Sequence, residues 1–373
     1  MPHLFVASKI NNKNSEPMKV IRYIMTGSYL LCLIMIPFLF GCKKDSPATT
    51  DNKLELGSVL QKNWMGQLDS LYGDVSLGEL TIPGTHLAGA DWYHVNDIDD
   101  EYMTQRYKIS DQLEMGIRFL DLRLGYDTHD CPSGLGLYNN EVNQMFMNED
   151  VYLNQSFLSV LTSIDAFLND NPSEMVILLI HQVHSSLDLI DFWGMVTAEV
   201  ADGGFSSERI VDYDPTKDTK LPLLSECRNK LLFMSTQHTY GFEGFTFSWP
   251  SNTSGYSKLV GNLNCHVQDM SKWDCFVPDD KSGYVNQLID QCRSVPKSNQ
   301  PENIFINFTS AYDICSDRGF IAASMNTSTV NYLSDKATNR NPCGIIVMDF
   351  AGDLEGIPVD FVRLLISINF NKE

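Results

Sequence analysis

Basic residues are scarce in this sequence relative to acidic ones. The chain of 373 residues carries 27 Lys and Arg against 47 Asp and Glu, a formal net charge of −20. Such a charge argues against a nucleic acid, or an anionic membrane surface, as a partner held by broad electrostatic attraction. A phosphate-bearing ligand would need a local cation to offset the field of the whole chain.

The sequence also lacks tandem repeats and a metal-site spacing among its cysteines. Seven of its 9 cysteines follow residue 42, at positions 131, 227, 265, 275, 292, 315 and 343. Their spacing matches none of the usual Cys and His patterns of metal sites. An odd number leaves at least one thiol unpaired. Cys265 with Cys275 is the pairing we expect first, and free buried cysteines are the alternative.

The apolar stretch near the N-terminus, residues 29–40, is too short to favour a membrane span. Lys19 and Arg22 precede it and Leu39-Phe-Gly-Cys42 follows it, which is the layout of a secretory signal. A cysteine directly after glycine resembles a bacterial lipobox, although Phe40 is bulkier than the usual residue there. We expect residues 1–42 to be an upstream extension and lipoprotein signal peptide, with Cys42 lipidated. Export to the bacterial cell envelope follows, with residues 43–55 as a polar tether.

The remaining residues, 56–373, have the pattern of one globular α/β domain. Hydrophobic residues make up 43% of the chain and aromatic residues 11%, enough for a sizeable core. The sequence predicts helices at 56–71, 109–115, 155–168, 187–200 and 358–368, and strands at 80–82, 117–124, 175–180, 230–234, 245–249, 303–308 and 344–350. Because strands alternate with helices, this pattern favours a parallel or barrel-like sheet.

One histidine occupies a position typical of a reactive group. Leu80-Thr-Ile-Pro-Gly-Thr-His86 predicts a strand that breaks into a turn at Pro83 and Gly84. A lone histidine is most often an ordinary core or surface residue. His86, however, follows a strand end in a glycine-flanked loop, where α/β barrels hold their reactive side chains.

Two residues of opposite charge follow on the next predicted strand. Asp121 and Arg123 alternate with Leu120 and Leu122, so both charged side chains point to one face. In a barrel that face can be the interior mouth; the alternative is a solvated surface.

Several segments, in this order, resemble the bacterial phosphatidylinositol-specific phospholipase C family: Ile82-Pro-Gly-Thr-His86, Gly116-Ile-Arg-Phe-Leu-Asp-Leu-Arg123, Phe167-Leu-Asn-Asp-Asn-Pro-Ser-Glu174, Ser248-Trp-Pro250, Val267-Gln-Asp269, Ile306-Asn-Phe-Thr-Ser310 and Val347-Met-Asp349. The resemblance implies an irregular (β/α)8-type TIM barrel and a metal-free phosphodiester cleavage. In that reaction the inositol 2-hydroxyl attacks its own phosphate, releasing diacylglycerol and a cyclic inositol phosphate.

The resemblance also implies roles for individual residues. His86 matches the general base and Asp349 the carboxylate that orients it, whereas Arg123 matches the cation that holds the phosphoryl oxygens, with Asp121 beside it.

The inositol ring is expected to contact a second group of residues. The resemblance places Asp269 and Trp273 against the sugar ring and makes Trp249 and Asn307 further pocket members. Core packing is the alternative for the tryptophans.

The departures from the family concern the acid half of the reaction. Leu87 stands where the family has an aspartate, and Asn139, Asn140 or Asn148 stands where it has a second histidine, the general acid. Ser235 lies near the place of an arginine that binds inositol. Such a site needs a replacement acid, because acid–base assistance contributes about 10²–10⁴-fold. His129 is the first candidate, followed by His94, His181 and His184.

The leading hypothesis is therefore a lipid-anchored phosphodiesterase, monomeric and without a cofactor, acting on a phosphoinositide or related phospholipid. An alternative is a catalytically impaired surface lipoprotein that binds inositol phosphates or glycans. A third hypothesis is a Ca²⁺-assisted enzyme that uses Asp121, Asp127 or Asp130.

Overall fold

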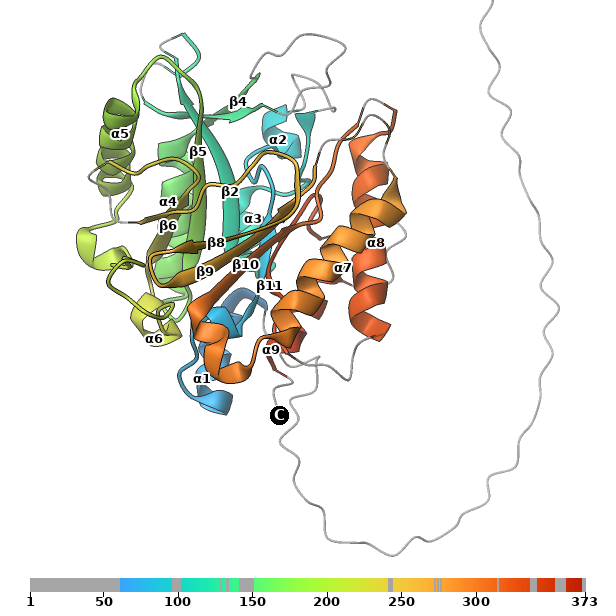
Figure 1. The fold of residues 1–373 in the computed structure, drawn as a ribbon. Helices are drawn as coiled ribbons and strands as arrows, with labels where there is room; N and C mark the ends of the chain where they lie inside the picture. The colour runs from blue at the N-terminus through green and yellow to red at the C-terminus, as the bar shows by residue number, and fades with distance from the viewer. Residues whose placement is uncertain are drawn as a thin grey trace, which may run out of the picture. The chain divides into compact units, whose positions relative to one another are not determined.

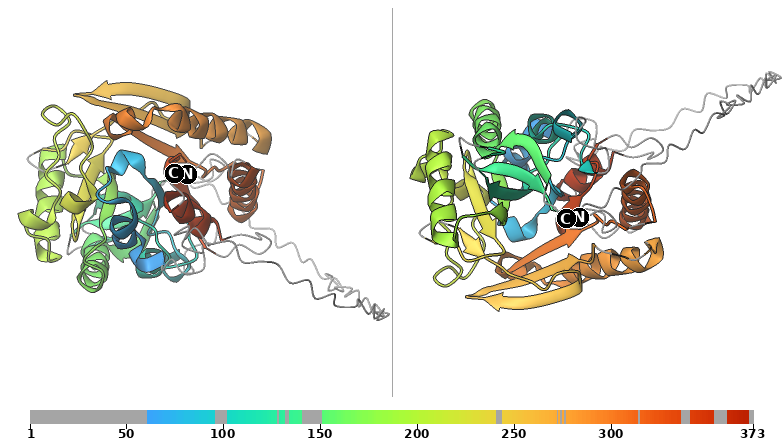
Figure 2. Two further views of the ribbon diagram at one scale, coloured as in Figure 1. Left: turned by 90° about the horizontal axis from the view of Figure 1, so that it is seen from below. Right: turned by 90° about the horizontal axis from the view of Figure 1, so that it is seen from above.

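A curled β-sheet with helices on its outer side forms the framework of the fold (Figure 1, Figure 2). The computed structural model describes residues 61–95, 102–127, 129–131, 134–140, 151–240, 244–271, 273, 275, 277–313, 315–335, 341–352 and 360–370. These residues all lie in one compact unit, residues 52–373. The predicted signal peptide with Cys42, the tether 43–55 and Asn148 lie outside the described residues.

The parallel strands follow one another around the sheet in chain order. Within the described residues they are β1 (Thr81–Thr85), β2 (Phe119–Tyr126), β5 (Val176–Ser185), β6 (Leu231–Ser235), β7 (Phe245–Thr246), β9 (Leu263–Asp269), β10 (Asn303–Phe308) and β11 (Gly344–Met348). Their order in the sheet is β7-β6-β5-β2-β1-β11-β10-β9, so β1 lies between β2 and β11. All carboxyl ends of these strands therefore meet at one edge.

Three further strands pair antiparallel with this set. β8 (Thr253–Val260) forms a hairpin with β9, while β3 (Gly136–Asn139) pairs with β2 and with β4 (Val151–Ser156). The sheet order starts at β7 and ends at β9 and β8, which leaves the barrel incompletely closed. The predicted α/β class and irregular (β/α)8-type barrel are thus confirmed.

The helices are α1 (Trp64–Tyr72), α2 (Trp92–Val95), α3 (Ile109–Glu114), α4 (Phe157–Asp170), α5 (Leu189–Asp202), α6 (Leu224–Cys227), α7 (Pro278–Ser294), α8 (Arg318–Asp335) and α9 (Phe361–Asn369). The predicted helices over 155–168, 187–200 and 358–368 match α4, α5 and α9 within a few residues. Helices α7 and α8, and strands β8 and β9, are absent from the prediction. No helix among the described residues has the length and apolar character that crossing a membrane requires.

Strand β1 differs from the prediction in one respect that matters for the site. It continues through Pro83 and Gly84, which pair with Ile346 and Val347 of β11, instead of turning there. A Cβ atom at Gly84 would lie 2.9 Å from the Phe119 ring, so glycine allows β1 and β2 to approach closely. The turn falls after Thr85 and delivers His86 to the carboxyl edge.

The opposite end of the sheet is held by a buried ion pair. Arg118, just before β2, donates through Nε and Nη2 to Glu174 Oε2 at 3.0 and 2.9 Å. Glu174 also accepts from the backbone N–H groups of Met65 and Gly66 in α1. Since both charged side chains are fully buried, this end of the molecule is structural, as expected for the face of a barrel opposite the reactive loops.

Candidate active site

Four neighbouring strands deliver titratable side chains to one place at the carboxyl edge. His86 follows β1, Asp121 and Arg123 lie on β2, and Asp349 directly follows β11. His181 lies on β5, in register with Arg123 on the adjacent strand. We call these five residues the histidine–carboxylate cluster. Because residues in register on parallel strands face the same side, His181 joins a group assembled from distant parts of the chain.

His86 and Asp349 form a buried pair. His86 Nδ1 lies 2.8 Å from Asp349 Oδ1, with side chains only 2% and 1% exposed. An ionised carboxylate can only accept, so Nδ1 carries the proton and Nε2 is left as the basic nitrogen. Nε2 lies on the side of Asp121, 3.9 Å from its Oδ2. The ring thus has the tautomer and orientation of a general base.

The backbone at both members of this pair is held in an unusual conformation. Leu87 and Phe350, the residues directly after His86 and Asp349, have φ angles of +43° and +50°. Left-handed backbone is costly for side chains of this size and persists only where the surroundings impose it. These two strained turns aim the imidazole and the carboxylate at each other.

Two buried polar residues supply that constraint. Gln105 donates through Nε2 to the carbonyls of His86 and Met348, and its Oε1 accepts from the Ala351 N–H. Thr104 accepts from the Phe350 N–H through its carbonyl and donates its hydroxyl toward the carbonyls at the His86 turn. Neither residue is predicted from the sequence, because nothing local distinguishes this pair from ordinary loop residues.

Asp121 and Arg123 form the second pair of the cluster. Arg123 donates through Nε and Nη2 to the two oxygens of Asp121, at 3.2 and 3.1 Å. Full burial by itself would raise the pKa of Asp121, but the charges of Arg123, His181 and His86 outweigh it and hold that pKa far below the usual range. Asp121 is therefore ionised at all ordinary pH values and orients the guanidinium fork of Arg123, which is 14% exposed.

His181 contacts the other side of Asp121. Its Nε2 lies 3.2 Å from Asp121 Oδ1 but is not aligned for a hydrogen bond, and its Nδ1 lies 2.8 Å from Thr236 Oγ1. The ring also meets Trp249 edge-on, with centroids 6.3 Å apart. Because β5 extends beyond the predicted range to Ser185, His181 is part of a strand and points into the cluster.

Two of the predicted inositol-contacting residues meet where the barrel is open. Trp249, after β7, donates from Nε1 to Asp269 Oδ2 at the end of β9, at 3.0 Å. Trp249 also lies against Phe308, whose ring meets that of His86 edge-on. The bond joins the loops that flank the opening, next to the histidine–carboxylate cluster.

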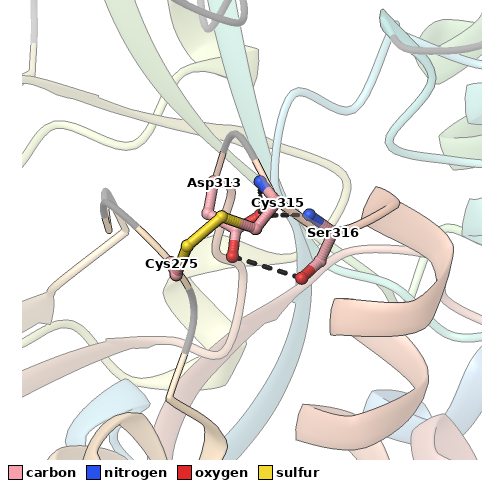
Figure 3. Close-up of a disulfide and its surroundings, with 4 residues drawn as sticks. All are labelled: Cys275, Asp313, Cys315 and Ser316. Atoms are coloured by element: carbon pink, nitrogen blue, oxygen red, sulfur yellow. Dashed lines mark hydrogen bonds between the residues drawn. A yellow bond between two sulfur atoms is a disulfide. The ribbon is translucent and has the colours of Figure 1, made fainter.

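Trp273 lies in a loop that is tied to its neighbour. Its backbone N–H donates to the Tyr312 carbonyl, and the Tyr312 N–H donates to Ser271. A disulfide joins Cys275 of the same loop to Cys315, close to Asp313, which accepts from the N–H groups of Cys315 and Ser316 (Figure 3). The expected Cys265–Cys275 bond is wrong. Cys265 lies buried within β9, whereas Cys275 belongs to the loop beyond that strand.

Two predicted residues lie away from the cluster. The His129 side chain is 95% exposed and its Nδ1 lies 3.4 Å from Asp130 Oδ1, while its backbone N–H donates to Asp127. Asn307 donates to the Val285 carbonyl of α7. It therefore faces the helix layer, whereas Phe308, the next residue along β10, faces His86. The prediction for Asn307 fails because successive strand residues alternate between faces.

The positions of the family's missing acid contain no titratable group. Asn139 is buried at the end of β3 and donates to the Tyr102 carbonyl. Leu87 packs into the hydrophobic core. His94 pairs with Asp91, and His184 with Asp127, so neither belongs to the cluster.

The calcium alternative gains no support from the arrangement of the acidic residues. Asp121 is enclosed by Arg123 and two histidines, whereas Asp127 contacts His129 and His184, and Asp130 contacts His129 and Tyr138. Among the described residues, no group of three or more His, Cys, Asp or Glu side chains is placed to hold a metal ion.

The fold and the cluster together define a class: an irregular α/β barrel with a histidine–carboxylate pair beside an arginine at its carboxyl edge. No family model matches the sequence. The chain is 25% identical to 1-phosphatidylinositol phosphodiesterase of Listeria monocytogenes, over 86% of this chain and 91% of that protein. It is 23% identical to the enzyme of the same name from Staphylococcus aureus strain Newman, over 78% and 88%.

Solved structures of enzymes from the same two bacterial species have a similar fold. A phosphatidylinositol-specific phospholipase C mutant of S. aureus superposes with a TM-score of 0.67 at 19% identity, covering 83% of this chain and 98% of that one. The L. monocytogenes enzyme superposes with a TM-score of 0.62 at 22% identity, covering 83% and 99%. The resemblance to the bacterial phosphatidylinositol-specific phospholipase C family is therefore confirmed in sequence and in fold.

Proposed function

We propose that the protein is a phosphodiesterase of the phosphatidylinositol-specific phospholipase C type. Its substrate is a phosphoinositide or a related glycerophosphodiester. The inositol 2-hydroxyl attacks the adjacent phosphorus, and the products are diacylglycerol and a cyclic inositol phosphate. The observation that carries the proposal is the buried His86–Asp349 pair next to the Arg123–Asp121 pair, in a chain that resembles such enzymes along most of its length.

The geometry supports a distinct role for each residue. His86 Nε2 accepts the proton of the attacking hydroxyl, and Asp349 stabilises the imidazolium that results. Arg123 presents its fork to the non-bridging phosphoryl oxygens and Asp121 fixes the plane of that fork. Asp269, Trp249 and Trp273, at the rim, hold the inositol ring by hydrogen bonding and stacking.

The test is cleavage of phosphatidylinositol in mixed micelles by the full chain, followed by release of diacylglycerol and cyclic inositol phosphate. We expect turnover by the wild type and a loss of about 10²–10⁴-fold in His86→Ala, because that variant has no general base. His238→Ala is the matched control, because His238 is an exposed histidine in the loop between β6 and β7. A folded wild type that turns over neither phosphoinositides nor glycerophosphodiesters would instead favour the impaired, ligand-binding alternative.

We also propose export and lipid anchoring through Cys42, on the strength of the sequence pattern at residues 39–42, with the protein acting as a monomer at the cell envelope. Cys42→Ala is expected to move the full chain from the membrane fraction to the soluble fraction. Cys32→Ala, within the apolar stretch, should leave the fractionation unchanged. Equal membrane association of both variants would contradict the anchor.

A further inference from the structure

No titratable residue stands where the resemblance places the general acid and its supporting aspartate. The histidine–carboxylate cluster nevertheless contains a second histidine. We propose that His181 is the general acid, donating a proton to the leaving glycerol oxygen. The inference rests on the proposed function and gives a role to a residue that has none in it.

The first support is the order of the strands. β1, β2 and β5 are neighbours, so His86, Arg123 and His181 come from three consecutive strands with the arginine in the middle. In an in-line displacement at phosphorus, the attacking and leaving oxygens lie on opposite sides of the transferred group. A base and an acid that flank the cation holding the phosphoryl oxygens have the corresponding arrangement.

The second support is the hydrogen bonding of the His181 ring. Thr236 Oγ1, 2.8 Å from Nδ1, can accept from Nδ1–H, so the charged ring carries its transferable proton on Nε2 and keeps the Nδ1 proton after donating it. Nε2 is buried and has no aligned acceptor in the free protein, although Asp121 Oδ1 lies 3.2 Å away. A substrate oxygen entering beside Arg123 would give this buried, poorly aligned donor a better acceptor.

The third support is the shared carboxylate. Asp121 lies between the two histidines, 3.9 Å from His86 Nε2 and 3.2 Å from His181 Nε2. Its negative charge favours the imidazolium form of either ring. A proton gained by His86 and a proton lost by His181 therefore keep the total charge around Asp121 constant through the reaction.

In the proposed step the inositol 2-hydroxyl loses its proton to His86 Nε2 while its oxygen forms a bond to phosphorus. The bond from phosphorus to the glycerol oxygen breaks with both electrons going to that oxygen, which takes the proton from His181 Nε2. The products are neutral diacylglycerol and the cyclic phosphodiester, and proton exchange with water restores both histidines.

The acid role has a pH signature. The charged groups that face the His181 ring are Asp121 and Arg123 from β2 and His86 from β1, with the neutral Thr236 and Trp249 on the other sides. Burial and the charge of Arg123 lower the pKa of His181 below its ordinary value of 6.5, and Asp121 offsets part of this. Since a general acid acts while protonated, lipid cleavage should fall as pH rises through this lowered pKa.

The decisive experiment varies the leaving group. Full-length wild type, His181→Gln and His86→Ala are assayed on phosphatidylinositol and on inositol 1-(4-nitrophenyl phosphate), whose nitrophenolate leaves without protonation. We expect His181→Gln to lose about 10²–10⁴-fold on the lipid but less than about tenfold on the nitrophenyl ester. His86→Ala should lose activity on both, and His238→Gln on neither.

Equal losses of His181→Gln on the two substrates, or no loss on either, would overturn the acid role while leaving the phosphodiesterase itself established. A loss in His129→Gln confined to the lipid would move the role to the loop histidine. A wild type that cleaves neither substrate would refute the proposed function and this inference together.

A second variant covers the possibility that His181→Gln fails to fold. Thr236→Val removes only the hydroxyl that orients the ring, and Thr236→Ser restores it. In Thr236→Val we expect a lower kcat on the lipid with an unchanged KM and a displaced alkaline limb of the pH profile; Thr236→Ser should recover both. A Thr236→Val enzyme with the wild-type profile on both substrates would contradict the assigned orientation.

Discussion

Gln105 determines where two reactive side chains point without belonging to the reaction itself. Its amide binds the carbonyls of His86 and Met348 and the N–H of Ala351, and it is almost completely buried. The strained turns at Leu87 and Phe350 lie between these contacts. Gln105 is therefore a positioning residue, because its hydrogen bonds stabilise the two strained turns and thereby hold His86 and Asp349 in place.

The substitution Gln105→Ala should lower kcat on phosphatidylinositol by about 10–10²-fold with little change in KM. The reason is that the base and its carboxylate lose their alignment, while the residues at the rim stay in place. Unfolding in urea should show a loss of about 1–3 kcal/mol, from the unpaired backbone groups. Gln287→Ala, exposed on α7, is the control. An unchanged kcat accompanied by the stability loss would reduce Gln105 to a purely structural role.

The residue pattern predicted the histidine–carboxylate cluster only where it coincides with strand ends. His86 and Asp349 are recognisable because each follows an apolar strand, and Arg123 because it alternates with leucines on one. His181 was only one of several candidates, since sequence does not reveal how far a strand continues beyond its apolar part. Asn307 was misplaced because the motif containing it does not specify which face of β10 it occupies.

At the scale of elements, the loops after β9 and β10 act as one unit. The Cys275–Cys315 disulfide and the backbone bonds of Tyr312 to Ser271 and Trp273 join them. Lys281 of α7 is buried beneath and donates to Gln268 and to the Met270 carbonyl. The loop that carries Trp273 is thus fixed from two sides, which lowers the entropy lost when it contacts a substrate.

Cys275→Ser with Cys315→Ser should loosen this unit. We expect a higher KM for phosphatidylinositol with kcat less affected, because the cluster lies on other strands. The disulfide closes a segment of 40 residues, and its loss should destabilise the protein by about 3–4 kcal/mol in the chain-entropy account. Dithiothreitol should reproduce the KM change in the wild type and leave the double variant unaffected. A reductant effect of equal size in both would point to the remaining cysteines.

Helices α7 and α8 are not predicted from the sequence because of their composition. α7 begins Pro278-Asp-Asp-Lys and α8 is rich in Ser, Thr and Asn, so neither has a strong apolar stripe or high intrinsic propensity. α7 packs against α8, β9 and β10, and α8 packs against α7 and α9, and these contacts stabilise both helices. Tertiary contacts override a weak local preference in both cases.

At the scale of the whole molecule, the residues that stabilise the barrel and the residues proposed to react lie at opposite ends of it. Arg118 and Glu174 are fully buried at the end opposite the histidine–carboxylate cluster, and they connect α1, β2 and β5. Both are charged and lie in segments that resemble the enzyme family, yet neither reaches the reactive edge. Their contribution is to the fold.

Glu174→Gln is expected to lower the free energy of unfolding by about 3–5 kcal/mol, because Arg118 is left as a buried, uncompensated charge. Urea denaturation followed by circular dichroism measures this. Removing both charges, in Arg118→Met with Glu174→Leu, should cost less than the two single changes added together. Glu114→Gln, whose partner Lys62 is about half exposed, should change stability by less than about 1 kcal/mol. A similar small effect at Glu174 would contradict the structural role.

The sequence by itself determined the alternation of strands and helices, the strand ends that present His86, Arg123 and Asp349, and the resemblance that connects them to a phosphodiesterase. These depend on local hydrophobic patterns and on short motifs. Only the tertiary structure decided that Cys275 pairs with Cys315, that β1 runs through Pro83 and Gly84, and that His181 lies against Asp121. Each of these depends on which segments become neighbours, and the order and register of the strands set those distances once the barrel has closed around its core.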